Sequence, residues 1–278
     1  MLRRTVLFAI ASLLLSPPPA SADLSRLFAP KASLKEEVWL EHSAGSAVTV
    51  DHSAWDGWLG RYVATDGDGV ARVAYGAVTA ADRQVLEGYL AALQAVDPAG
   101  LNRDEQLAYW INMYNAVTVD LILDHYPVGS IRDIGSGLLD TGPWDRELVR
   151  VKGRALSLND IEHGIIRPVF NEPRIHYAVN CAAISCPNLA GKAWTGAGLE
   201  ADLAAAERSY VNDPRGVRVE GGSVVLSSIY NWFREDFGAS EAAVLARLAG
   251  VAEGALAETL AGKGAVDSYA YDWALNDR

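Results

Sequence analysis

Apolar residues recur at spacings of three and four along most of the chain, and this pattern predicts a molecule built mainly of helices. The strongest signal covers residues 103–125, where side chains from Leu107 to His125 keep to one face. Asn102 can cap the first turn of this helix, and Pro127 follows its end. Weaker patterns of the same kind predict further helices at 51–63, 79–96, 157–167, 198–211, 229–233, 241–248 and 253–260.

Alternating apolar and polar positions occur only in short runs separated by turns, as in β-hairpins. Residues 148–158 alternate on either side of Lys152-Gly153, and residues 217–219 and 224–226 flank Gly221-Gly222. Single short strands are predicted at 70–75, 175–180 and 266–273. Because helices dominate and no regular strand-helix alternation calls for a doubly wound parallel sheet, we expect an α+β protein, a helix-rich single domain with a small antiparallel sheet.

The N-terminus has the pattern of a signal peptide. Arg3 and Arg4 precede an apolar run over 5–15, three prolines follow, and small residues at 20–22 precede Asp23. This run falls short of the roughly 20 apolar residues that a spanning helix needs, and no later stretch is long and apolar enough to span a bilayer. We therefore expect cleavage of residues 1–22 and a periplasmic or secreted protein without a transmembrane segment.

The charge balance argues against nucleic acid as a partner. Residues 1–22 hold two of the 24 basic residues and no acidic residue, so residues 23–278 carry 22 basic and 35 acidic residues, a formal charge of −13. Half of the chain is hydrophobic, which supports a sizeable core and argues against disorder. There is no internal repeat or long low-complexity stretch, so residues 23–278 are expected to form one globular domain.

Several segments carry a family resemblance: AYWINMYNAV at 108–117, LNDIEHGIIR at 158–167, EPRIHYAVNCAAISCP at 172–187, LSSIYNWFREDFG at 226–238 and YDWALN at 271–276. In this order they resemble the domain of unknown function 547 family. The resemblance implies no chemistry, because the family is named for its lack of an assigned activity, but its bacterial members often carry signal sequences. A more distant similarity, of fold alone, is to papain and transglutaminase-like enzymes, in which a long helix packs against an antiparallel sheet carrying a histidine.

Thiol chemistry is the most concrete reaction that these residues suggest. Cys181 is the candidate nucleophile of a thiol hydrolase or acyl-transferase, which also needs a base within hydrogen-bond reach. The chain departs from the papain-like order, in which the cysteine heads the long helix and precedes the histidine. Here that helix offers Trp110 and Asn112, and both cysteines follow His176.

His163 is the first candidate base. Asp160 lies one turn before it and is expected to orient it, and Arg167 lies one turn after it. Glu162 projects about 100° away from His163 around the helix, so both reach one site only at its edge. The alternative for residues 158–167 is an amphipathic helix whose charged face is solvated.

His176 is the second candidate base. If residues 175–180 form a straight strand, the alpha carbons of His176 and Cys181 lie about 16 Å apart and their side chains point to opposite faces. The two residues then cannot form a dyad by themselves.

Asn112 and Asn115 are neighbours on the long predicted helix, where asparagine has a low propensity. The favoured interpretation is structural: buried amides that hold adjacent backbone in place. The alternative is that they support an oxyanion. Two aromatic sets are interpreted as core, namely Tyr109, Trp110 and Tyr114, and Tyr230, Trp232 and Phe233.

The two cysteines leave three alternatives open. In an exported protein, Cys181 and Cys186 can persist as a disulfide if the chain turns between them. Otherwise Cys181 is a free nucleophile, or the cysteines are buried or bind a metal with His176. The equal spacings of five residues match no familiar zinc pattern.

Three hypotheses of different classes follow: a non-catalytic binding or structural module of the envelope held by a Cys181–Cys186 disulfide, a thiol hydrolase or acyl-transferase, and a metal-dependent site built from His163, His176 and the cysteines. No cofactor is expected, and the partner is an unknown envelope ligand or substrate. The residues predicted to converge in one cleft are Glu162, His163, His176, Asn180 and Cys181.

Overall fold

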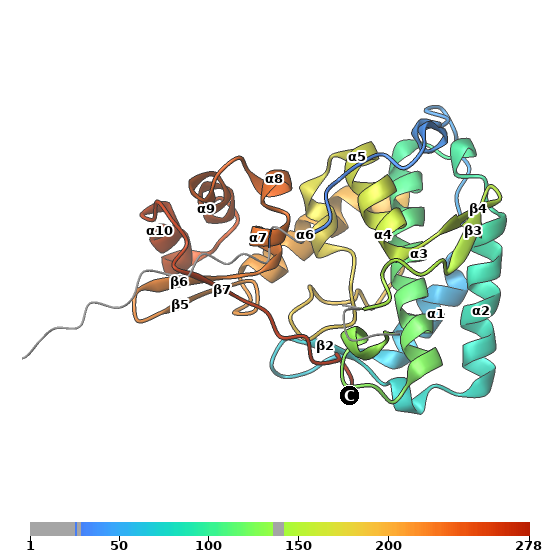
Figure 1. Ribbon diagram of the computed structural model, residues 1–278, viewed down its shortest axis with the longest axis horizontal. Helices are drawn as coiled ribbons and strands as arrows, with labels where there is room; N and C mark the ends of the chain where they lie inside the picture. Colours follow the sequence, from blue (N-terminus) through green and yellow to red (C-terminus); the bar gives the residue numbers. More distant parts are fainter. Residues whose placement is uncertain (1–25, 27–28, 136–141) are drawn as a thin grey trace, which may run out of the picture.

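The computed structural model describes residues 26, 29–135 and 142–278 (Figure 1). The predicted leader at 1–22 lies outside the described residues. The α-helices of the described part are α1 Ser53–Tyr62, α2 Ala80–Ala95, α3 Arg103–His125, α4 Leu158–Ile161, α5 Arg167–Phe170, α6 Leu199–Val211, α7 Ile229–Trp232, α8 Arg234–Phe237, α9 Glu241–Ala249 and α10 Gly254–Ala261, and short 3₁₀ and π-helical turns lie between them. Within the described residues no helix is long and apolar enough to cross a membrane.

The long helix α3 has the predicted bounds, and the Asn102 side chain accepts a hydrogen bond from the Glu105 backbone N–H at its first turn. More of its surface is buried than the single apolar face that the sequence predicted, because other segments enclose the middle of the helix on nearly all sides. Thr118, which was expected on the apolar face, is buried, and so are polar side chains outside that face, namely Glu105, Gln106, Asn112 and Asn115. A helix buried all round needs partners for these groups, and the loops around it supply most of them.

The strands are short and form small sheets, which confirms the α+β class. They are β1 Val63–Thr65, β2 Ala71–Val73, β3 Val149–Val151, β4 Arg154–Leu156, β5 Val217–Glu220, β6 Ser223–Ser227 and β7 Ser268–Ala270. The pairs β1–β2, β3–β4 and β5–β6 are antiparallel, whereas β7 joins β6 in parallel. Both predicted hairpin turns are present, and Lys152-Gly153 and Gly221-Gly222 have positive φ angles as tight hairpin turns require.

The predicted strand at 175–180 is wrong. Residues Pro173–Tyr177 form a 3₁₀ helix, η7, with Pro173 in its first turn and the Glu172 carboxylate accepting from the Arg174 backbone N–H. Proline fits a helical first turn, and the carboxylate satisfies a donor that a strand would pair with a neighbour. The argument that a straight strand separates His176 from Cys181 therefore does not apply.

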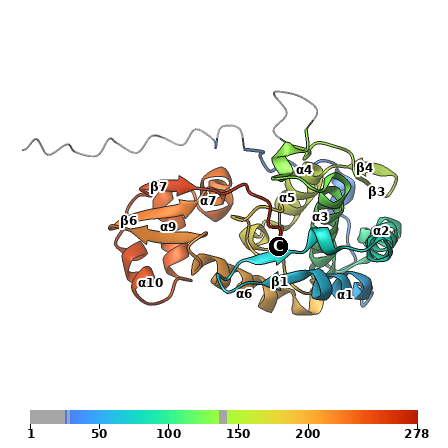
Figure 2. The same cartoon turned by 90° about the horizontal axis from the view of Figure 1, so that it is seen from below.

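Two hydrophobic cores divide the molecule. The larger core gathers buried residues of α1 to α4 and the first turn and a half of α6, and the smaller core gathers those of β5, β6 and α7 to α10. Figures 1 and 2 show these parts side by side with α6 between them. Helix η7 contributes Ile175 to the larger core and Tyr177 to the smaller one, so His176 lies at the boundary.

The segment after β7 returns to the larger core. It forms a bridge from Asp277 to Val73 and another from Leu275 to Ala183.

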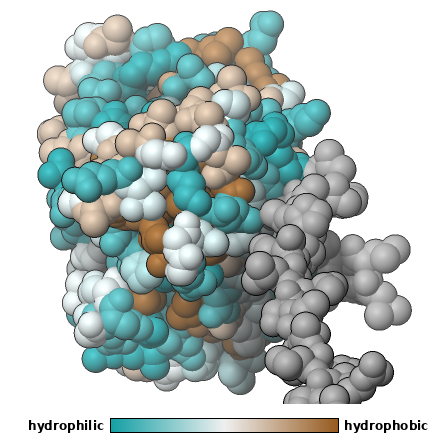
Figure 3. Space-filling view, turned by 90° about the vertical axis from the view of Figure 1, so that its left-hand side faces the viewer, coloured by the Kyte–Doolittle hydropathy of each residue, from teal (hydrophilic) through white to brown (hydrophobic). Residues whose placement is uncertain are grey.

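The end of the molecule that carries α9 and α10 has a mixed surface. Hydrophilic and weakly hydrophobic residues alternate there with small strongly hydrophobic areas (Figure 3).

Candidate functional site

The segment after β4 buries the polar residues Glu162, His163 and Arg167. Ser157 and Asp160 form the predicted capping box at α4, and a π-helical turn, η6 Glu162–Ile166, then joins α4 to α5. Glu162, His163 and Arg167 are only 7%, 7% and 4% exposed. The alternative of a solvated charged face is therefore wrong.

Asp160 does not orient His163 as predicted. Its carboxylate accepts from the Ser157 backbone N–H and pairs with Lys35 Nζ at 2.6 Å. The capping box holds this side chain at the helix start, where it accepts from the backbone of Ser157. Arg167 takes the place beside His163 instead, with Nη1 3.2 Å from His163 Nδ1.

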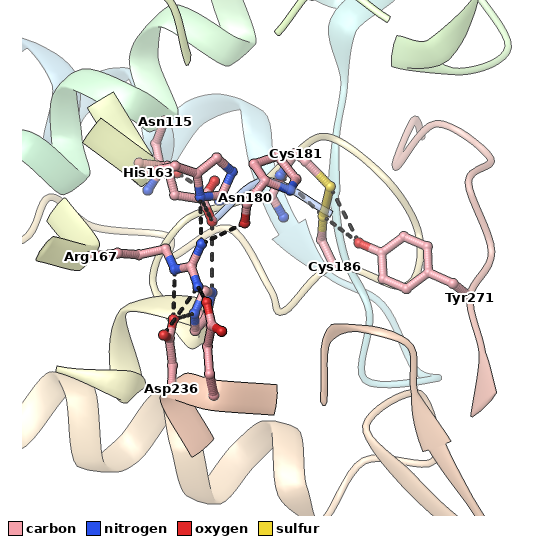
Figure 4. Close-up of polar contacts among 12 residues, drawn as sticks. Asn115, His163, Arg167, Asn180, Cys181, Cys186, Asp236 and Tyr271 are labelled. Carbon is pink, nitrogen blue, oxygen red and sulfur yellow. Dashed lines mark hydrogen bonds and ion pairs between the residues drawn. A yellow bond between two sulfur atoms is a disulfide. The ribbon is translucent and has the colours of Figure 1, made fainter. Parts of the chain in front are cut away.

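Arg167 lies at the centre of a buried ionic cluster (Figure 4). Its Nε and Nη2 atoms donate to the two oxygens of Asp236 at 2.6 and 3.1 Å, and Nη1 also donates to the Pro30 carbonyl. His176 Nε2 lies 2.7 Å from the same Asp236 carboxylate. The cluster thus joins α5, η7 and α8 across the boundary between the two cores.

The cluster fixes the protonation of His163 and Asp236. Burial lowers the pKa of His163 to about 4. Arg167 can only donate, so His163 Nδ1 accepts and the neutral ring carries its proton on Nε2. Burial alone would raise the pKa of Asp236, but the hydrogen bonds from His176 and Arg167 outweigh it and hold this pKa well below its ordinary value.

Glu162 and aromatic rings complete the surroundings of the two histidines. Glu162 Oε1 lies 3.7 Å from His176 Nδ1 and 3.9 Å from His163 Nδ1. Burial raises the pKa of Tyr114 well above its ordinary value, and the negative charge of Glu162 acts in the same direction. The Phe233 ring stacks on His176 with centroids 4.5 Å apart.

Asn112 and Asn115 hold neighbouring backbone, as the structural interpretation predicted. Asn112 donates to the Trp194 carbonyl at 2.8 Å and accepts from the Trp194 N–H at 3.0 Å. Asn115 donates to the Ala178 carbonyl at 2.9 Å and accepts from the Asn180 N–H at 2.8 Å. Each amide clamps one stretch of loop onto α3, and its donor and acceptor are both in use.

Cys181 and Cys186 form a disulfide, with their alpha carbons 6.3 Å apart. Cys181 is half-buried, whereas Cys186 is only 3% exposed. The Tyr271 hydroxyl contacts both sulfur atoms, at 3.3 and 3.1 Å. Between the cysteines, Ala182 has a φ of 60°, which only glycine adopts freely, and the Asn180 side chain accepts from its N–H.

Of the five residues predicted to converge in one cleft, Glu162, His163 and His176 lie in one buried cluster. Asn180 and Cys181 follow η7 on the loop that Asn115 clamps (Figure 4), and their convergence with the cluster stays a prediction. Two surface hollows of about 520 Å³ lie elsewhere, one along α6 and one at the start of α3, and none of these residues lines them.

Asp236 and Tyr271 were missed in the sequence analysis, although both lie in segments that carried the family resemblance, 226–238 and 271–276. Their contacts identify them as partners of the predicted site: Asp236 pairs with Arg167 and His176, and Tyr271 contacts the disulfide. The only indication in the sequence was that an acidic residue and a tyrosine hydroxyl lie in segments that carry the family resemblance.

Chemically, the arrangement offers a buried ionic cluster beside a disulfide loop. The bridge leaves no thiolate on Cys181, so nucleophilic catalysis requires its reduction. Among the described residues, no group of three or more histidine, cysteine and acidic side chains is placed to hold a metal ion.

Comparison with protein families agrees with the resemblance seen in the sequence. Residues 98–211 match the family model described as protein of unknown function, DUF547, which confirms that resemblance. The match includes α3, the π-helical turn and both cysteines, and ends before Asp236 and Tyr271. Neither the curated proteins nor the solved structures contain a significant match to the chain.

Proposed function

We propose that the chain is an exported protein of the bacterial envelope that acts as a non-catalytic binding module, held by the Cys181–Cys186 disulfide. The bridge carries this proposal, because it takes up the only two thiols of the chain. A disulfide of this kind persists in an oxidising compartment, which fits the signal-peptide pattern of residues 1–22.

The other groups that an acyl-transfer enzyme would need already have internal partners. The Asn112 and Asn115 amides hold backbone, and His163 accepts a hydrogen bond from Arg167. A base whose acceptor nitrogen is occupied by a buried cation cannot take a proton without breaking that contact. This supports a rigid scaffold rather than a reaction centre.

Half-buried aromatic side chains beside the bridge supply the binding surface in this proposal. Tyr271 packs on Trp273 and Trp232 with ring centroids 4.7 and 4.8 Å apart, and Trp144 packs on Trp273 at 5.8 Å. Aromatic rings of this kind combine a large apolar area with a polar edge, as binding surfaces often do.

The thiol state of the mature protein tests the proposal. We expect protein recovered from the envelope fraction of its host to begin at Asp23 and to be lighter by two hydrogen atoms than the same chain after reduction. Iodoacetamide without reductant should label neither cysteine, in the folded or in the urea-unfolded protein, and both cysteines after reduction. Intact-mass and peptide-mass measurements give these results.

Three other results would contradict the binding module or its export. Rapid labelling of Cys181 alone in the folded protein would favour the thiol hydrolase or acyl-transferase. Labelling of both cysteines on unfolding without reductant would show buried thiols and no bridge. Retention of Met1, or recovery from the cytoplasm, would contradict export.

A further inference from the structure

The two sulfur atoms of the bridge have unequal surroundings. Cys181 is half-buried at the start of the loop, and Cys186 is 3% exposed. An external thiolate must reach a sulfur along the axis of the bond that it breaks, so the more accessible sulfur is the one attacked. Cys181 is the more exposed of the two residues, so attack is expected at its sulfur.

Cys186 has the contacts of a good leaving group. Its Sγ accepts from the Cys181 backbone N–H at 3.1 Å and lies 3.1 Å from the Tyr271 hydroxyl. Burial raises the pKa of Tyr271 well above its ordinary value, so the hydroxyl keeps its proton and can donate. Hydrogen bonds to a thiolate lower its pKa, and a thiolate of lower pKa leaves faster.

Arg215 holds the backbone of the bridged loop. Its guanidinium donates to the carbonyls of Ile184 and Cys186. The same guanidinium is paired with Asp213, with Nη2 2.8 Å from one carboxylate oxygen. Arg215 therefore positions the loop around Cys186, and its charge is balanced by Asp213.

From these contacts we infer that the Cys181–Cys186 disulfide is a thiol–disulfide exchange site, attacked at Cys181 by a thiol of an external dithiol protein, with Cys186 as the leaving group and Tyr271 as its hydrogen-bond donor. The inference rests on the bridge and goes beyond the binding function proposed above. It requires no hydrolase or acyl-transferase chemistry.

The reaction proceeds in two displacements. The partner's thiolate forms a bond to Cys181 Sγ, the Cys181–Cys186 bond breaks, and its electron pair stays on Cys186 Sγ. The partner's second thiolate then attacks its own bridging sulfur and releases Cys181 as a thiolate. The partner's dithiol is oxidised to a disulfide, the two cysteines are reduced, and each thiolate takes a proton from solvent according to its pKa.

The loop is held in place by contacts that do not involve sulfur. Asn115 clamps the backbone before Cys181, and the segment after β7 pairs with Ala182, Ile184 and Ser185 through backbone N–H and carbonyl groups. Reduction therefore leaves the fold intact, and exchange takes place in the folded protein.

Trapping with glutathione tests which sulfur is attacked. The oxidised, folded protein is mixed with glutathione, and the reaction is stopped with excess iodoacetamide before peptide mass analysis. We expect glutathione on Cys181 and the alkyl group on Cys186. The reverse assignment, or no mixed disulfide except in urea, would overturn the exchange site.

Tyr271→Phe tests the donor, since it removes only the hydroxyl. We expect the bridge to form as in the parent chain and glutathione to attack it about 10-fold more slowly, the size of one hydrogen bond to a charged group. Tyr109→Phe is the matched control, because its buried hydroxyl donates to the Leu93 carbonyl within the larger core, and its rate should equal that of the parent chain. Equal rates for Tyr271→Phe and the parent chain would contradict the role of Tyr271.

These outcomes separate the two proposals. Attack at Cys186 overturns the exchange site, and an unchanged Tyr271→Phe rate overturns the role of Tyr271 in it. Both results leave the binding module standing. A protein whose two cysteines stay free thiols in the folded state, even after incubation with oxidised glutathione, overturns both proposals.

Discussion

His163 is a neutral imidazole in a buried, charged setting. Burial lowers its pKa to about 4, against about 6.5 in an unfolded chain. Between these values the unfolded state binds a proton that the folded state does not. The contribution of His163 to the free energy of unfolding is therefore fully present above pH 6.5, and it is lost as the pH falls towards 4.

We predict that the free energy of unfolding decreases by about 3 kcal/mol between pH 7 and pH 4 through His163 alone. His163→Asn should flatten this part of the pH profile, because Asn keeps an acceptor near Arg167 and does not titrate. Urea unfolding at a series of pH values measures the slope. Asp236, whose pKa is lowered, adds a further loss only as the pH falls below about 4.

The control for this prediction is His42→Asn, which changes an exposed histidine. It should leave the slope unchanged. If His163→Asn kept the full slope of the parent chain, the neutral, buried assignment of His163 would be wrong.

For the residues of the ionic cluster, the sequence indicated which side chains belong to the site but not how they are buried or paired. Glu162, His163 and His176 were selected from the sequence because of their chemistry and spacing. Their burial was not predictable, since it depends on Phe233 and Asp236, which lie 57 to 74 positions further along the chain. The expected pairing of Asp160 with His163 failed because the capping box and Lys35 take up the Asp160 carboxylate.

Helix α3 acts as the support of the disulfide loop. Through Asn115 it holds the backbone at Ala178 and Asn180, directly before Cys181. Removing that amide leaves a buried N–H and a buried carbonyl without partners, and each costs about 1–3 kcal/mol.

We predict that Asn115→Ala lowers the free energy of unfolding by about 2–4 kcal/mol. The matched control is Asn159→Ala, whose half-buried amide donates to the exposed Asp145 carboxylate, and it should cost less than about 1 kcal/mol. Urea denaturation of both variants and the parent chain makes the comparison. A similar loss for the two variants would contradict the clamp.

Elements with strong local signals were predicted well. Helices α2 and α3 and both hairpins follow from side-chain caps and positive-φ turns that a few neighbouring residues determine. The 3₁₀ helix η7 and the parallel pairing of β7 with β6 were not predicted, because short apolar runs adopt strand or helix according to their partners.

The two cores meet through Arg167, whose side chain is 1% exposed and whose carboxylate partner Asp236 comes from α8. Removing one member of a buried ion pair leaves the other charge without compensation, which costs about 3–5 kcal/mol. This contact therefore links the stability of one part of the molecule to that of the other.

We predict that Arg167→Met lowers the free energy of unfolding by about 3–5 kcal/mol. Arg218→Met, which breaks the more exposed pair of Arg218 and Glu220 on β5, should change it by less than about 1 kcal/mol. Chemical denaturation followed by tryptophan fluorescence measures both variants. An Arg167→Met protein as stable as the Arg218→Met protein would show that the cluster does not hold the cores together.

The return of the segment after β7 to the larger core has a consequence for the timing of folding. Tyr75 bonds to Asn276 across 201 positions of sequence, and Leu275 pairs with the loop that carries the bridge. Contacts of such long range cannot form until the chain has been synthesised as far as Asn276. For the export proposed above, we expect nascent chains that lack this segment to remain open and fit for threading through a secretion channel, with bridge closure among the later steps.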